Sequence, residues 1–217
     1  KNLASFTSIG YTDQQGTLRN TDLKRFNFRS NLNGKSNDGR LTYGTNLTAN
    51  FSKSNQATSL GTGGVNQNYV LGALKGAPYL DPDQYDGTYA SFWNDMNSQG
   101  NYLSGSLLKG SPFLLLDKLR WFTNRQDEFK AIAQGNINYK LTKDLSIGSS
   151  LGVDYTTINQ ARHDDHRSFN SWYFAADDQE FLGNASDINE RTVSFNALTH
   201  LKWSKKFNDL HEIKAGI

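Results

Sequence analysis

Residues 41–52 read LTYGTNLTANFS, and this stretch decides the fold class because it alternates strictly in polarity. Its odd positions carry Leu41, Tyr43, Leu47 and Phe51 between Thr and Ala, whereas its even positions are Thr, Gly, Asn and Ser. A repeat of two residues is typical of a β-strand with one apolar and one polar face. Strands of soluble proteins usually run about 5–6 residues, whereas a tilted membrane-crossing strand needs roughly 9–11. The stretch therefore predicts a membrane-spanning strand.

The same pattern recurs, and the connections between its copies alternate in length. It predicts strands at 3–12, 23–33, 41–52, 129–142, 145–157, 191–203 and from about 212. The connections after the first, third and fifth strands are the longer ones, namely 13–22, 53–128 and 158–190. Outer-membrane barrels have short turns at one end and long loops at the other. We therefore expect an all-β fold, a transmembrane antiparallel β-barrel in which 53–128 and 158–190 are large extracellular loops.

Aromatic residues on the apolar faces gather at two levels. Those next to the long connections are Tyr11, Phe26, Phe51, Phe129 and Tyr155, and those next to the short ones are Tyr43, Tyr139 and Trp203. With a rise of about 3.3 Å per residue and a tilt of about 40°, the levels lie roughly 20–25 Å apart. That is the height of the apolar band of such barrels, flanked by its aromatic girdles. A β-sandwich with its apolar face inward is the alternative.

Composition sets limits on the remaining possibilities. The chain has 217 residues, a net charge of +2 and no cysteine, which excludes disulfides and thiolate metal sites. Mean hydropathy is −0.67, but barrel strands place half of their residues in a polar lumen. No basic run indicates nucleic acid. Because bacterial single-chain barrels have even strand numbers, seven strands indicate that residues 1–217 are an internal piece of one barrel domain, without a plug domain.

Several short stretches in the first three quarters of the chain occur in a distinctive order. The first is Ile9-Gly10-Tyr11 with Asp13-Gln14-Gln15-Gly16, followed by residues 20–32 and by Gly44-Thr45-Asn46-Leu47 before Phe51-Ser52-Lys53. Further ones are Ala77-Pro78-Tyr79-Leu80, Tyr85-Asp86-Gly87-Thr88-Tyr89, Ser111-Pro112 and Thr123-Asn124-Arg125, then Asn138-Tyr139-Lys140-Leu141, Leu145-Ser146-Ile147 and 151–155. Each is a strand or turn pattern, and their order is more specific than any one of them. In this order they resemble the SusC-like TonB-dependent transporters of Bacteroidetes.

The resemblance implies a 22-stranded barrel of the outer membrane with an amino-terminal plug. It also implies energy supplied through TonB, a SusD-like surface lipoprotein as partner, and uptake of glycans or oligopeptides. The plug and the TonB box are not in these 217 residues.

Motifs for catalysis or metal binding are weak. Gly148-Ser149-Ser150-Leu151-Gly152 fits G-x-S-x-G, but that nucleophile needs a strand-to-helix turn and here it falls within a predicted strand. His163-Asp164-Asp165-His166 and 81–87 offer metal-binding groups, yet a solvated patch and turn chemistry explain them more simply. The carboxylates Asp177, Asp178 and Glu180 are read as solvated too. We therefore expect no enzyme activity, no metal site and no cofactor.

Solute contact is expected from aromatic residues of the two long loops. Trp93 and Trp172 lie among polar neighbours, and such rings stack on sugars or hold peptide side chains. The alternative is that they pack the loops or contact a partner. The charges expected on the lumen side are Arg25, Arg29, Lys130, Lys140, Asp154, His200 and Lys202.

The leading hypothesis is thus an outer-membrane importer in contact with lipid. The alternatives are a passive porin, a soluble adhesin or carbohydrate-binding module, and a secreted hydrolase.

Overall fold

A computed structural model of the chain describes residues 2–56, 70, 73–74, 112–168, 171, 183–207 and 211–217. In this part of the chain lie seven strands and helix α3. Their bounds are β1 Leu3–Gln15, β2 Asp22–Lys35, β3 Leu41–Asn55, α3 Pro112–Trp121, β4 Phe122–Lys140, β5 Leu145–Asp164, β6 Asn184–Phe207 and β7 His211–Gly216.

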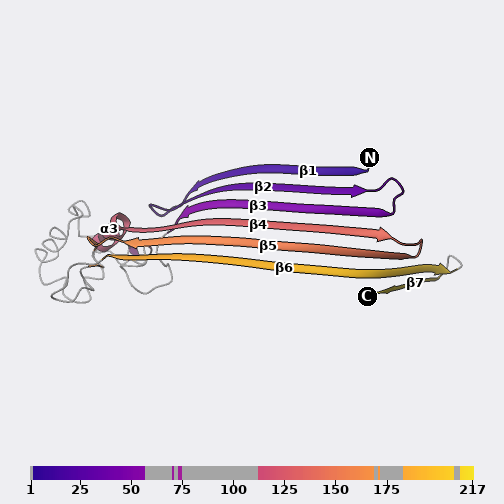
Figure 1. The fold of residues 1–217 in the computed structure, drawn as a ribbon. Helices are drawn as coiled ribbons and strands as arrows, with labels where there is room; N and C mark the ends of the chain where they lie inside the picture. Colours follow the sequence, from indigo (N-terminus) through magenta and orange to yellow (C-terminus); the bar gives the residue numbers. More distant parts are fainter. Residues whose placement is uncertain are drawn as a thin grey trace, which may run out of the picture.

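The strands form one antiparallel sheet in chain order, β1 to β7. Figure 1 shows them side by side, with both chain ends and the short connections at one end of the sheet and α3 at the other. We call these the turn end and the loop end. All seven predicted strands and the alternation of connection lengths are confirmed.

Three strands run further toward the loop end than the sequence predicted. β4 begins at Phe122 rather than Phe129, β5 continues to Asp164, and β6 begins at Asn184. The added residues are mostly polar on both faces, so hydrophobic alternation does not identify them, but their backbones still pair with one another, as in Asp127↔Asn159↔Asn189. The segments between strands are therefore 56–121 and 165–183, shorter than the expected 53–128 and 158–190.

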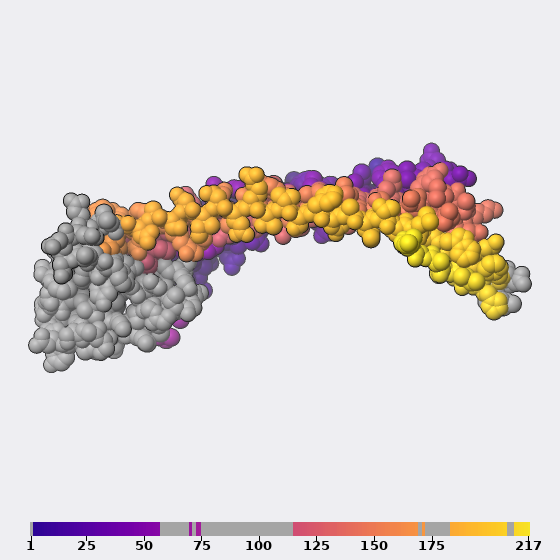
Figure 2. Space-filling model, turned by 60° about the horizontal axis from the view of Figure 1, so that its bottom comes forward, coloured from indigo at the N-terminus to yellow at the C-terminus, as the bar shows by residue number. Residues whose placement is uncertain are grey.

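The register gives the sheet an apolar and a polar face. Directly opposed residues share a face, so Ile9↔Phe28 and Leu151↔Ala197 lie on the apolar one. Neither face is covered within the described part of the chain, where Ser168 is the one side chain of which less than 2% is exposed. Figure 2 shows the sheet as a thin, curved layer. Because the described sheet has no core of its own, its apolar face must contact an apolar environment that the described residues do not supply.

Helix α3 is the one described helix of substantial length, and the sequence analysis missed it. Its signals are those of a short helix: Pro112 at the first position, then a leucine run, then Lys118 and Arg120 in the last turn. At ten residues it would be marginal alone, so contacts with the sheet must hold it.

Gly44 marks a close approach on the polar face. A Cβ on Gly44 would lie 2.5 Å from Asn136 Oδ1 and 2.6 Å from Asn33 Oδ1, on the strands at either side. We predict that Gly44→Ala lowers the free energy of unfolding by up to about 1 kcal/mol, because both amide side chains must rotate away from the new methyl group. The measurement is urea unfolding of the protein folded in detergent. The control is Gly135→Ala, whose Cβ meets nothing within 4 Å; equal effects of the two changes would contradict the register.

Candidate functional site

The apolar face carries a row of aromatic side chains at its loop-end side. Tyr11, Phe26, Phe51 and Phe129 are cross-strand partners in sequence across four strands. They are 37–65% exposed, and Tyr155 lies one row further in, with its ring centroid 6.2 Å from that of Phe129. Four of the five aromatic residues expected at this level thus form one continuous row, and the fifth, Tyr155, lies next to it.

Charged residues follow directly beyond this aromatic row. Asp13, Lys24, Lys53 and Asp127 form the next row of the same face. The ion pairs Lys24–Asp13 and Lys53–Asp127 span 3.8 and 3.9 Å and are exposed, so they add little to stability. An aromatic row with a charged row outside it is the arrangement expected where hydrocarbon gives way to polar headgroups.

The second girdle, toward the turn end, is staggered. Tyr43 lies over Gly34 of the neighbouring strand, since a Cβ there would come within 2.2 Å of the Tyr43 ring. Tyr139 pairs with Ile147, and Trp203 lies opposite Leu145. Between the two levels this face carries apolar residues such as Leu47, Val153 and Phe195 near its middle. The apolar face is therefore built as a lipid-facing band.

Adjacent residues at mid-band give a test of this assignment. We predict that Leu47→Arg lowers the free energy of unfolding in lipid by about 2–4 kcal/mol, because the charge would face hydrocarbon. Asn46→Arg, one residue away on the polar face, should change it by less than about 1 kcal/mol. Unfolding of both variants from lipid vesicles provides the measurement. Equal tolerance of arginine at the two positions would contradict a lipid-facing band.

The polar face is lined mainly by amides and hydroxyls. A typical row is Asn31↔Asn46↔Gln134, continued by Gly152 and Asn196. The charges expected there share this face, as the register confirms: Arg25, Arg29, Lys130, Lys140, Asp154, His200 and Lys202. Lys130 Nζ lies 3.5 Å from Asp154 Oδ2, so this pair is satisfied within the sheet. Such a face suits a wet or plugged lumen rather than a dry core.

At the loop end, a buried ion pair joins α3 to β5. Lys118 Nζ lies 3.1 Å from Asp164 Oδ2, with side chains only 6% and 15% exposed. The same ammonium lies 4.0 Å from the centroid of the Phe122 ring, within cation–π range. Burial lowers the pKa of Lys118, and the Asp164 carboxylate opposes that shift.

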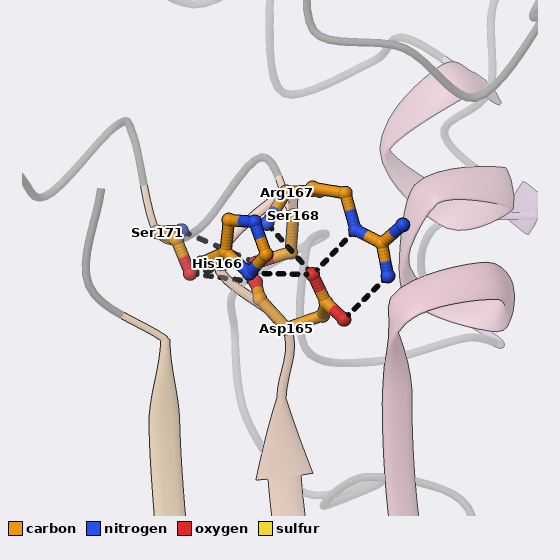
Figure 3. A network of polar contacts seen from close by, with 5 residues as sticks. All are labelled: Asp165, His166, Arg167, Ser168 and Ser171. Atoms are coloured by element: carbon orange, nitrogen blue, oxygen red, sulfur yellow. Dashed lines mark hydrogen bonds and ion pairs between the residues drawn. The ribbon is translucent and has the colours of Figure 1, made fainter. Parts of the chain in front are cut away.

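A second contact fixes the chain directly after β5. Arg167 donates from Nε and Nη2 to the two carboxylate oxygens of Asp165, at 2.8 and 2.9 Å (Figure 3). This guanidinium holds the pKa of the Asp165 carboxyl well below its usual range. It also lies 3.9 Å from the centroid of the Trp121 ring, at the end of α3, while the Asp165 amide donates to the Trp121 carbonyl at 3.0 Å.

Further hydrogen bonds extend this group toward β1 and β2. Asn20 Nδ2 donates to the Leu119 carbonyl at 2.7 Å, so the turn after β1 holds α3 from another side. Asn20 has a φ of 61°, which asparagine tolerates better than most residues. We call α3 with Asp164, Asp165 and Arg167 the loop-end cluster. It fixes the chain where the long segment 56–121 returns to the sheet.

Among the described residues, the groups considered as metal ligands or as a nucleophile are engaged in other contacts. His163 and Asp164 fall on opposite faces of β5, Asp164 binds Lys118, and Asp165 binds Arg167. These carboxylates are therefore not the solvated patch that the sequence indicated. Ser150 lies inside β5, paired with neighbours on both sides, as expected. No group of three metal-ligating side chains occurs in the described residues.

The remaining predicted residues lie outside the described part of the chain. These are Trp93, Trp172, the 81–87 stretch and the carboxylates Asp177, Asp178 and Glu180. Among the residues described, no helix is long and apolar enough to cross a membrane.

The buried Lys118–Asp164 pair generates a prediction for the loop end. Lys118→Met should weaken the docking of α3 by about 3–5 kcal/mol, because Asp164 keeps its charge in a buried place without this cation. Faster hydrogen exchange of the α3 amides is the expected result. The control is Lys24→Met, which removes an exposed pair and should cost less than about 1 kcal/mol. Unchanged exchange in Lys118→Met would show that the pair does not hold the helix.

Comparison with known proteins bears on this architecture. No family model and no curated protein matches the sequence. Among solved structures, the chain matches the RagAB peptide importer in its "closed-closed" state, with a TM-score of 0.67 and 18% identity over 100% of this chain. It matches the "open-open" state with a TM-score of 0.68 and 20% identity over 99% of the chain. The chain has the fold of one sector of a β-barrel transporter. It spans 22% of the matched chains' length.

Proposed function

We propose that this chain is part of a SusC-like, TonB-dependent importer of the outer membrane, which takes up glycans or oligopeptides together with a SusD-like lipoprotein. The observation that carries the proposal is the match over the whole chain to both states of a peptide importer. The sequence resemblance to SusC-like transporters supports it independently.

The two faces of the sheet suit this role. The apolar band between its aromatic levels would meet lipid, and the amide-rich face would line the lumen. Solute would be held at the loop end, where Trp93 and Trp172 are the proposed contacts. Within the loop-end cluster, helix α3 would give the long segment that precedes it a fixed base beside the proposed entrance. The proposed role is that of a transporter, and the proposal includes no bond-breaking step.

A passive porin is the second candidate, because a lumen face of asparagine, glutamine and serine would also suit a water-filled pore. The two differ in their need for energy. A TonB-dependent importer requires the proton-motive force of the inner membrane, whereas a porin does not.

Uptake measurements with the intact transporter test the proposal. Cells with and without its gene are given a labelled oligopeptide mixture or a labelled glycan mixture, with and without a protonophore. We expect gene-dependent uptake of one class, abolished by the protonophore. Trp93→Ala with Trp172→Ala should raise the half-saturating concentration about tenfold or more, whereas Trp203→Phe, on the lipid-facing side, should not.

Gene-dependent uptake that persists with the protonophore would favour the porin. A protein recovered from the soluble fraction would reject both candidates. A lipoprotein that purifies with the transporter in detergent is the result expected for the SusD-like partner.

A further inference from the structure

The carboxyl end of helix α3 is capped by donors from two other parts of the chain. Because the helix ends at Trp121, the carbonyls of its last turn lack their usual partners within the helix. Asn20 Nδ2 donates to the Leu119 carbonyl at 2.7 Å, and the Asp165 amide donates to the Trp121 carbonyl at 3.0 Å. Asn20 belongs to the turn between β1 and β2, 99 residues from Leu119 in sequence. The helix therefore takes part of its capping from a distant turn.

The backbone conformation of Asn20 suits this contact. Asn20 has a φ of 61° and is the one non-glycine residue with a positive φ in the described part of the chain. Glycine adopts this left-handed conformation without steric cost, and asparagine is one of the few other residues that tolerate it. Glycine would therefore serve the turn alone, but it has no side chain that could donate to the helix. Asparagine serves both.

Hydrogen bonds inside the turn fix the position of Asn20. The Gly16 amide donates to the Thr21 carbonyl at 2.8 Å, and Thr21 Oγ1 donates to the Leu18 carbonyl at 2.7 Å. Neither bond involves α3, so the turn is closed by its own residues. It presents the Asn20 carboxamide in a defined position, which lowers the conformational entropy lost when the contact to the helix forms.

The same end of α3 carries the contacts to β5. Lys118 pairs there with Asp164, and Arg167 lies over the Trp121 ring. Cations near a helix carboxyl end are also favoured by the helix dipole. In the strand order, β5 and the β1–β2 turn lie on opposite sides of β4, which follows α3 directly. The helix is thus held from two sides, and without the Asn20 contact the β5 side would act alone.

We propose that Asn20 is a positioning residue for solute binding, because its hydrogen bond fixes the orientation of α3 relative to the sheet. The long segment that precedes α3 includes Trp93, the proposed solute contact. This role rests on the proposed import function. It assigns a task to the connection between β1 and β2, which is the shortest of the three at the loop end.

The first measurement is hydrogen exchange of the α3 amides in the intact transporter in detergent. Asn20→Gly keeps the left-handed turn but removes the donor, and we expect exchange about three- to tenfold faster. Asn20→Asp keeps the size of the side chain, but its carboxylate cannot donate and lies at the negative end of the helix dipole, so exchange should be at least as fast. The control is Asn37→Gly, which removes an amide contact to Asn2 in the turn between β2 and β3 and should leave α3 unchanged.

The second measurement is uptake of the labelled oligopeptide or glycan mixture that cells with the wild-type transporter take up. Asn20→Gly should raise the half-saturating concentration about threefold or more and change the maximal rate by less than about twofold, because it weakens solute binding rather than translocation. A role in folding alone would instead reduce the amount of transporter, and so the maximal rate. Asn37→Gly should change neither quantity.

The two measurements separate failure of this role from failure of the import function. Unchanged α3 exchange in Asn20→Gly would overturn the proposal, whatever the uptake shows. Faster exchange with an unchanged half-saturating concentration would overturn the role in solute binding and leave import itself intact. A wild type without gene-dependent uptake would reject the proposed function, and this role with it.

Discussion

Backbone hydrogen bonding between neighbouring strands is the constraint on which the rest of this structure depends. No other described part of the chain covers either face of the sheet, so burial of side chains among the described residues does not hold it together. In hydrocarbon an unpaired N–H or C=O costs several kcal/mol, and the described ladders pair strand with strand along most of their length. The sheet can therefore expose its apolar residues on one side and amides on the other. Its stability comes from pairing and from the solvent on each side rather than from a core.

The loop end is held together differently, because the strands there are mostly polar, extend beyond the apolar band and connect to a long segment. Here the structure uses buried charge and stacked guanidinium groups instead of aliphatic packing. Lys118 with Asp164, and Arg167 between Asp165 and Trp121, join α3 to the end of β5. Buried pairs of this kind specify one arrangement more than they add stability. That property suits a short helix that must stand in a defined place beside an entrance.

The periodic part of the structure was predictable, and the non-periodic part was not. Phe51 and Phe129 could be assigned to one girdle because alternation and connection length both restrict the register. The extension of β4 from Phe129 back to Phe122 could not, because residues 123–128 are polar on both faces and their pairing depends on β5. Helix α3 carried a usable signal in Pro112 and the leucines after it. The ion pair of Lys118 with Asp164 had none, since its partners are far apart in sequence and meet only through the fold.

The polar extensions of β4, β5 and β6 would set how far the proposed solute entrance lies above the aromatic row. Residues 122–128 lie beyond the aromatic row and, at about 3.3 Å per residue with a tilt near 40°, rise roughly 15–20 Å above it. In a membrane the barrel wall would extend through the headgroup layer and beyond it. A solute would meet the protein well above the lipid surface, and a protein that closes the entrance would rest on the rim of this wall rather than on the bilayer.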